Sequence, residues 1–410
     1  MKFVLSHIPQ IPGDKEKLAP IGRNTEAYQK MLAEVQALVL RADELGFYGY
    51  GTAEHHFHTE GYEVNSQPMM LYTKLATLTR NIKFIPLSLV PVSTNPLYVA
   101  EQAAMFDQMF PGRIEVALAR GYQARWMQTM AQQENVTSGM PGSESDTRNR
   151  EIYTEYVEVI KLAWTEDAFN YNGKHIQVPF PYEGIKNYGG AAIARRYGSP
   201  GEVNDDDTIA KIGVVPAPYS RPYPQLWLPF TLNPQTLVNA AAEGYNMLIS
   251  NSDPSKFQDF LELFQKTAAG VGRDVELGEN VCPVREVIVG DSYDEAFDIA
   301  VRGPGQVFYD YFQNFGFMEN WRRPEDDPAN FPLMFDSPEA LAKRWVDTKF
   351  ILCGTPSDVA EQVDDLRTGH GIGANVSHLA YQQAGQGSLP PEVTMRQLER
   401  VSQEVFAKFM

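Results

Sequence analysis

The chain has 410 residues, of which 43% are hydrophobic and 21% are charged, and its formal net charge is −17. These values are close to globular averages, so the chain can bury a large core without disulfide or metal support. No apolar run reaches the roughly 18 residues of a membrane span, the first residues do not resemble a signal peptide, and no stretch gathers the basic residues that bind a phosphate backbone. We therefore expect a cytoplasmic globular protein without a nucleic-acid or membrane partner.

The chain has two cysteines, Cys282 and Cys353. They are too few and too far apart for a zinc motif or a disulfide framework. We expect isolated thiols without a redox role.

Short apolar runs alternate with longer amphipathic segments along the chain, which is the pattern of a parallel sheet covered by helices. Helix starts with a capping residue before proline occur at Asn95, Asn233, Asp253 and Thr355. The candidate strands are residues 2–8, 47–52, 82–90, 113–120, 226–230, 246–251, 281–290 and 376–382. Eight such strands predict one (β/α)8 TIM barrel over residues 1–410.

Two long stretches interrupt the alternation. Residues 183–224 mix glycine, proline and an acidic run, and residues 302–336 separate the last two candidate strands. Insertions of this size usually lie at a barrel's substrate-binding mouth. The second begins with Gly303-Pro304-Gly305 and continues with aromatic residues at helical spacing. We expect either a hinged lid over an apolar substrate or an ordinary packed core segment.

The second candidate strand runs directly into Glu54-His55-His56-Phe57-His58. Side chains just past the C-terminal end of a barrel strand point into the active-site mouth, and imidazoles titrate near neutral pH. This segment is therefore expected to hold a general base. Histidines and a glutamate are also zinc ligands, so a zinc hydrolase is an alternative, but the other strand ends supply no further histidine or carboxylate, and we expect no metal.

The fourth candidate strand ends at Arg120, which Gly121 and Tyr122 follow. A guanidinium at this position can hold a phosphate through two parallel hydrogen bonds, and a salt bridge on the barrel rim is the alternative. After the fifth strand, the segment with Thr231 and Gln235 turns into a helix whose free amides suit a phosphate. Together they predict a phosphate pocket, although no Walker or dinucleotide glycine motif is present.

Several motifs occur together: Glu54-His55-His56-Phe57, Asn95-Pro96, Phe106-Asp107-Gln108-Met109, Gly112-Arg113 and Ala119-Arg120-Gly121. In this combination the chain resembles the bacterial luciferase-like flavin-dependent monooxygenases, with the closest likeness to the luciferase α chain type. The likeness resumes at residues 153–166, 224–250 and 354–356, so it covers most of the chain outside the two insertions.

The resemblance implies a barrel that binds FMN as FMNH2 at its C-terminal mouth and forms a flavin C4a-hydroperoxide with O2. The barrel would then oxygenate a small, largely apolar organic substrate such as an aldehyde, a ketone or a ring compound. It also implies a separate flavin reductase that supplies FMNH2, and a homodimer.

Carried over by position, the family's catalytic histidine falls on His55, and Glu54 precedes it under the flavin. The arginines that bind the flavin phosphate fall on Arg120 and Arg150. A non-proline cis peptide bond that supports the isoalloxazine ring falls between Leu87 and Ser88. Three further residues are expected to contact the cofactor: Tyr122, Thr231 and Gln235.

Some positions depart from the luciferase α chain. Ala119 stands where that chain has a reactive cysteine, and Asn251 where it has a tryptophan that faces the flavin. These departures leave FMN as the expected cofactor and argue against light emission from a fatty aldehyde. An F420-dependent oxidoreductase of the same barrel family and a non-catalytic flavin-binding protein remain alternatives, and His55 and Arg120 favour the monooxygenase.

Overall fold

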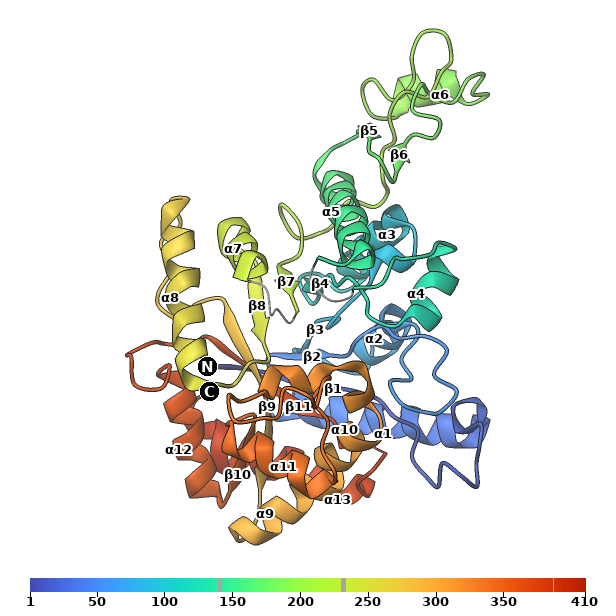
Figure 1. The fold of residues 1–410 in the computed structure, drawn as a ribbon. Helices are drawn as coiled ribbons and strands as arrows, with labels where there is room; N and C mark the ends of the chain where they lie inside the picture. The colour runs from blue at the N-terminus through green and yellow to red at the C-terminus, as the bar shows by residue number, and fades with distance from the viewer. Residues whose placement is uncertain (139–141, 230–233, 386) are drawn as a thin grey trace. The chain divides into compact units, whose positions relative to one another are not determined.

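The computed structural model of the chain describes residues 1–138, 142–229, 234–385 and 387–410. Its internal contacts divide it into two units. The first comprises Met1–Pro68, Lys74–Leu87 and Leu226–Met410, and the second comprises Met69–Thr73 and Ser88–Gln225. In Figure 1 the first unit is coloured mainly blue and yellow to red, and the second cyan to green.

A curled parallel sheet of eight strands forms the centre of the first unit. The strands pair in the order β3-β2-β1-β11-β9-β8-β7, and β10 pairs with β9. Their bounds are β1 Lys2–His7, β2 Gly49–Gly51, β3 Lys83–Phe84, β7 Leu226–Leu228, β8 Asn246–Ile249, β9 Val281–Val289, β10 Ile351–Gly354 and β11 His378–Gln383. This half-barrel confirms the predicted TIM-barrel class.

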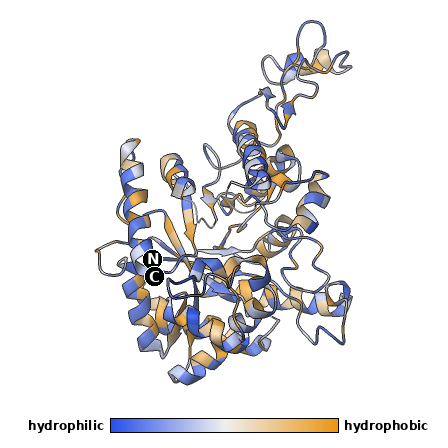
Figure 2. Cartoon of the chain, in the orientation of Figure 1, coloured by the Kyte–Doolittle hydropathy of each residue, from blue (hydrophilic) through white to orange (hydrophobic). Residues whose placement is uncertain are grey.

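Most of the strands are short. They are deeply buried because helices cover the sheet. Every residue of β8 and β9 is buried, and Figure 2 shows β8 as a hydrophobic strand. Phe3 of β1 stacks on Phe406 with ring centroids 3.8 Å apart. A Cβ at Gly51 would lie 2.5 Å from the Leu87 side chain, so glycine at the end of β2 lets the chain after β3 approach closely.

The helices of the first unit begin at the expected capping residues where these are described. The side chain of Asp253 accepts from the amide of Lys256, and Thr355 forms a capping box with Asp358, whereas Asn233 lies outside the described residues. The helices are α1 Thr25–Glu44, α7 Pro234–Glu243, α8 Pro254–Gly270, α9 Tyr293–Ala300, α10 Gln306–Asp310, α11 Pro338–Asp347, α12 Pro356–Arg367 and α13 Pro391–Arg400. Shorter 3-10 or π turns are Ile21–Arg23, Val301–Gly305, Phe312–Phe315, Phe317–Trp321, Val401–Val405 and Phe406–Lys408.

The second unit packs its helices around a small core that includes Val90, Trp126 and Ile152. Its elements are the 3-10 turn Pro91–Ser93, α3 Pro96–Met109, β4 Val116–Ala117, α4 Ala124–Ala131, α5 Glu144–Thr165, β5 Tyr171–Asn172, β6 Gln177–Val178 and α6 Ala191–Tyr197. Helix α2, Pro68–Ala76, contains residues of both units. The insertion at 183–224 contains α6, and an antiparallel bridge joins its Ile185 to Ile209.

The predicted strand positions are confirmed, but most strands are shorter than predicted, and three strands were missed: β10 and the short pair β5 and β6. Residues 82–90 give only Lys83–Phe84, and residues 113–120 give only Val116–Ala117. Strand β10 was missed because its apolar run of four residues is too short for periodicity to identify. Both cysteines are free and buried, so the expectation of isolated thiols is confirmed. No helix in the described ranges is long and apolar enough to cross a membrane.

The segment 302–336 is packed against α11 and the core of the first unit. Phe308, Phe312 and Trp321 are buried in one cluster with Trp345 and Phe350. This packing is what the core alternative predicts, and it leaves lid motion as an untested prediction. The Gly-Pro-Gly start is a kink inside a continuous helical stretch.

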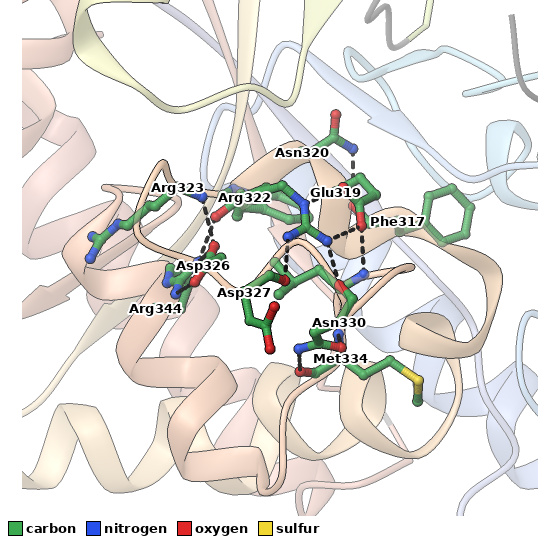
Figure 3. A network of polar contacts seen from close by, with 12 residues as sticks. Phe317, Glu319, Asn320, Arg322, Arg323, Asp326, Asp327, Asn330, Met334 and Arg344 are labelled. Carbon is green, nitrogen blue, oxygen red and sulfur yellow. Dashed lines mark hydrogen bonds and ion pairs between the residues drawn. The ribbon is translucent and has the colours of Figure 1, made fainter.

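Polar contacts also join this segment to α11 (Figure 3). The two terminal nitrogens of Arg344 donate to the carboxylate of Asp326 at 2.8 and 2.7 Å, and Arg344 Nη1 also donates to the Trp321 carbonyl at 2.8 Å. The pairing with Arg344 lowers the pKa of Asp326 to about 2. This bidentate, largely buried pair therefore fixes the polar end of the segment.

Candidate active site

In the first unit, the loop that follows β2 carries a group of five residues that we call the histidine cluster: Glu54, His55, His56, His58 and Glu63. His55 Nδ1 lies 3.2 Å from Glu63 Oε1, and His58 Nδ1 lies 3.6 Å from Glu63 Oε2. His56 Nε2 lies 2.9 Å from Glu54 Oε1. Glu63 is therefore placed between two imidazoles, and Glu54, the carboxylate expected beside His55, pairs with His56.

Backbone hydrogen bonds hold the loop that carries this cluster. The amide of His55 donates to the Asn65 carbonyl at 3.0 Å, and the amide of Val64 donates to the Pro9 carbonyl at 3.0 Å. Phe57 and Glu63 adopt the left-handed conformation, with φ of 66° and 49°. Non-glycine residues adopt it only where the surrounding contacts enforce it, which indicates a loop with a defined shape.

The imidazole of His55 is kept neutral by its surroundings. Burial, followed by the neighbouring His58 and His56, lowers the pKa of His55 well below its usual value. A neutral imidazole has one N–H and one lone pair, so it can accept a proton. This is the state that a general base requires near neutral pH.

Tyr311 of the segment 302–336 reaches the histidine cluster. Its hydroxyl lies 3.0 Å from His58 Nδ1 and donates to Glu60 Oε1 at 3.2 Å. Its ring stacks on Tyr62 with centroids 4.6 Å apart. Burial raises the pKa of Tyr62 to about 12, so Tyr62 is a neutral hydrogen-bonding group at pH 7.

The geometry does not support the zinc-hydrolase alternative. Within the described part of the chain, no three His, Cys, Asp or Glu side chains are grouped so that they could hold a metal ion. In the histidine cluster each carboxylate faces the ring nitrogen of an imidazole. In this cluster Glu54 contacts His56, and Glu63 lies against both His55 and His58.

In the second unit, Arg120, Asp146 and Arg150 form an arginine cluster. Arg120 Nη1 donates to Asp146 Oδ1 at 2.7 Å, and Arg150 Nη2 donates to Asp146 Oδ2 at 3.2 Å. Burial of Asp146 opposes its ionisation, but the hydrogen bonds from Arg120 and Arg150 outweigh burial and lower its pKa. Two guanidiniums thus share one carboxylate, which leaves one net positive charge.

Helix α5 and a glycine fix the backbone at Arg120. Asn149 Nδ2 donates to the Arg120 carbonyl at 2.7 Å, and the Tyr153 hydroxyl donates to the Leu118 carbonyl at 2.9 Å. Gly121 has φ of 74°, and a Cβ there would lie 2.1 Å from the Met127 sulfur. The left-handed turn at Gly121 favours glycine, and the Arg120 guanidinium pairs with Asp146 in the first turn of α5.

The donor set of the arginine cluster fits a phosphate. The side chain of Arg120 is 27% exposed and that of Arg150 is 40% exposed, whereas Asp146 is 4% exposed. The guanidiniums are thus accessible while their shared carboxylate is covered. Arginine forks bind phosphate bidentately, and the first turn of α5, which carries Asp146, adds a favourable helix dipole.

The other predicted site residues are spread over several elements. The Leu87 amide donates to the Thr52 carbonyl at 3.0 Å, and Ser88 is buried. The Tyr122 hydroxyl accepts from Gln123 Nε2 at 2.7 Å. Gln235 is exposed on α7 and donates to Asn239 Oδ1, and Thr231 lies outside the described residues.

The expected cis peptide bond is not found. Every cis bond in the described ranges precedes a proline, and the bond between Leu87 and Ser88 is not among them. A non-proline cis bond costs about 3 to 4 kcal/mol and forms only where the surroundings impose it. The sequence likeness at this position was therefore a poor guide to the bond's geometry.

Sequence reasoning missed Glu63 and Asp146. Asp146 lies four residues before Arg150 in α5, so i, i+4 spacing could have identified it as a partner of that arginine. Glu63 lies eight residues after His55 in an irregular loop, where no periodicity relates the two. Its place between the imidazoles could only be found from the folded loop.

A family model described as luciferase-like monooxygenase matches residues 17–372. The chain is 22% identical over 383 residues to 3,6-diketocamphane 1,6-monooxygenase of Pseudomonas putida, covering 90% of this chain and 91% of that one. It is 23% identical over 330 residues to the oxygenase component of the flavin-dependent trigonelline monooxygenase of Acinetobacter baylyi, covering 78% of each.

Solved structures share the fold. The oxygenating constituent of 3,6-diketocamphane monooxygenase from the same organism, a type II Baeyer-Villiger monooxygenase in complex with FMN, aligns with a TM-score of 0.71 and 19% identity, over 100% of this chain and 99% of that one. The coenzyme F420-dependent tetrahydromethanopterin reductase of Methanopyrus kandleri aligns with a TM-score of 0.59 and 16% identity, over 100% and 99%. At these identities the structures show the fold alone.

The family match extends over most of the sequence and includes both the histidine cluster and the arginine cluster. It agrees with the half-barrel of the first unit. The chain therefore belongs to the luciferase-like monooxygenase family of enzymes.

Proposed function

We propose that this chain is the oxygenase component of a two-component monooxygenase, with residues 1–410 forming one barrel. It takes FMNH2 from a separate flavin reductase and uses O2 to oxygenate a small, largely apolar organic substrate. The relatives named as flavin-dependent and diketocamphane monooxygenases support this reaction class. The observation that carries the cofactor assignment is the arginine cluster, because two accessible guanidiniums around one covered carboxylate suit a phosphate.

Each site residue expected from the sequence has a task in this proposal. Arg120 and Arg150 bind the FMN phosphate, and His55 holds or accepts a proton during oxygenation. Glu54 fixes His56, and we retain Leu87, Ser88, Tyr122, Thr231 and Gln235 as further FMN contacts. Bound reduced FMN supplies the electrons that activate O2.

The substrate class is an aldehyde, a ketone or a ring compound. Anaerobic titration with FMNH2, followed by mixing with ¹⁸O2 and a substrate panel, tests the activity directly. We expect one ¹⁸O atom in the product and no product without FMNH2. Products without ¹⁸O would overturn the assignment.

An F420-dependent oxidoreductase is the second candidate, because the reductase from Methanopyrus kandleri shares the fold. Titration with reduced F420 separates the two. Tight binding of F420 together with hydride transfer in the absence of O2 would favour this candidate. A chain that only binds flavin, the third possibility, would bind FMNH2 and give no oxygenated product.

We propose that the enzyme is a homodimer. Tyr98, Met105 and Met109 lie on one face of α3 and are 56%, 51% and 44% exposed. Exposed apolar residues along one helix face are typical of a subunit interface. Sedimentation equilibrium should show a dimer that Met105→Glu dissociates, whereas Val271→Glu, an exposed apolar position on α8's C-terminal end, should leave it intact.

A further inference from the structure

Glu63 is a buried carboxylate that the assignment above leaves without a task. It is 3% exposed, and its two oxygens face two different imidazoles. The Oε1 to His55 Nδ1 distance of 3.2 Å is within hydrogen-bonding range, whereas the 3.6 Å to His58 Nδ1 is longer than a hydrogen bond. The closer contact of Glu63 is therefore with His55.

The carboxylate of Glu63 constrains the tautomer of His55. An ionised carboxylate has only acceptor atoms, and a neutral imidazole has one N–H. With Oε1 facing Nδ1, the favourable arrangement puts the proton on Nδ1, where it donates to Glu63. Nε2 is then the ring atom with the lone pair, which is the atom that can accept a proton.

Glu63 is held in place from two sides. Its backbone φ of 49° is in the left-handed region, which a non-glycine residue adopts only where the surrounding contacts enforce it. On the far side of the carboxylate, His58 Nδ1 is 3.0 Å from the Tyr311 hydroxyl, which itself donates to Glu60. If the single proton of that hydroxyl goes to Glu60, the hydroxyl accepts from His58 Nδ1, and in this arrangement the Nδ1 proton of His58 lies toward Tyr311.

Other titratable groups lie around this arrangement. His56 pairs with Glu54, and Tyr62 stacks on Tyr311 beside Asp310 and beneath the ammonium of Lys15. Glu60 accepts from the Tyr311 hydroxyl, whereas Glu63 lies against His55. Glu60 therefore offers a matched control in the same loop.

We propose that Glu63 is a positioning residue that holds His55 with its proton on Nδ1, so that Nε2 is the atom that takes up a proton during oxygenation. The proposal rests on the proposed monooxygenase function for the catalytic part. The tautomer itself requires only the folded chain.

The direct test is ¹⁵N NMR of the full chain labelled at histidine, with the His55 signals assigned from their loss in His55→Gln. We expect the wild-type protein to show the Nδ1–H tautomer of His55. In Glu63→Gln the amide presents both a donor and an acceptor, so the preference for Nδ1–H should fall. Glu63→Asp keeps the carboxylate and should restore part of it, and Glu60→Gln should leave the His55 signals unchanged.

The kinetic readout uses FMNH2, O2 and the panel substrate with the highest product yield. Loss of the positioned tautomer should lower kcat by about 10² to 10⁴-fold, as general acid-base groups contribute that much, with KM and FMNH2 affinity within about twofold of wild type. Glu60→Gln should keep kcat within about threefold. The kcat loss without a KM change separates positioning from a general structural defect.

Either of two results would overturn the proposal. One is a wild-type His55 protonated on Nε2, a measurement that needs no variant to fold. The other is a folded Glu63→Gln whose His55 tautomer and kcat equal those of wild type. Because NMR needs neither flavin nor substrate, a failure of the monooxygenase proposal would leave the tautomer result standing and visible as a separate outcome.

Discussion

Replacing Arg120 with alanine tests the phosphate assignment most directly. The guanidinium has five N–H donors, and Nη1 donates to Asp146, so other donors can reach a phosphate. A charge-assisted hydrogen bond contributes about 1.5 to 3 kcal/mol, which is about tenfold to a hundredfold in affinity. We expect FMNH2 to bind Arg120→Ala weaker by that factor in an anaerobic titration.

The comparison with reduced riboflavin isolates the phosphate from the rest of the flavin. Riboflavin lacks the phosphate, so its affinity should change by less than about twofold. Arg148→Ala is the matched control, since Arg148 lies on α5 near Arg150, is exposed and donates to the side chain of Gln133. It should leave both affinities unchanged.

Stability must be followed in the same variant. Without Arg120, the covered carboxylate of Asp146 keeps only Arg150, at 3.2 Å. We expect a loss of about 1 kcal/mol in the free energy of unfolding, measured by urea denaturation without flavin. The reasoning would be refuted by equal FMNH2 affinities of wild type and variant. An equal loss of affinity for FMNH2 and riboflavin would also refute it, because the arginine would then act on the fold and not on the phosphate.

Two further predictions concern the first unit. His55→Ala should bind FMNH2 with an affinity within about twofold of wild type, but its oxygenation rate should fall by about 10² to 10⁴-fold. It should also release more hydrogen peroxide for each FMNH2 consumed. An unchanged product yield would show that His55 has a structural role. Asp326→Asn should lower the free energy of unfolding by about 2 kcal/mol. Arg344 holds the pKa of Asp326 at about 2, whereas the pKa of an aspartate in the unfolded chain is near 4. A carboxyl group with a lowered pKa in the folded state stabilises the fold at pH values above about 4. That stability should disappear as the pH falls from about 4 to 2, whereas Asp327→Asn, which still accepts from the Ala329 amide, should behave as wild type.

The sequence predicted the barrel because its signals are local. Alternating apolar runs, the capping residues at Asp253 and Thr355 and glycine at the strand ends depend on neighbours within a few residues. Strand lengths were overestimated at 82–90 and 113–120 because apolar composition continues after the strand pairing stops. Only the folded chain shows where the hydrogen-bonded ladder ends.

The site was predictable to a different extent at each residue. His55 and Arg120 follow directly after strands, so their position in the fold could be inferred from the chain order. Glu63 approaches His55 across an irregular loop in which Phe57, Gly61 and Glu63 turn left-handed, and no sequence pattern specifies those turns. Pairing of Glu54 with His56 was missed for the same reason, since adjacent side chains in an irregular loop have no fixed direction.

Aromatic spacing in 302–336 was compatible with both a lid and a core, and a measurement of how often the segment opens would separate the two. Opening the whole segment would expose Phe308, Phe312 and Trp321, each worth about 1.5 to 3 kcal/mol when buried, so the open state should be populated less than about 1 in 10³. Hydrogen exchange tests this at the Phe335 amide, which donates to Gln313 Oε1 at 3.0 Å. We expect a protection factor of at least about 10³ at the Phe335 amide and a much smaller one at the amide of Ala329 in the exposed loop. If the Phe335 amide were protected no more than the Ala329 amide, the segment would open as a lid.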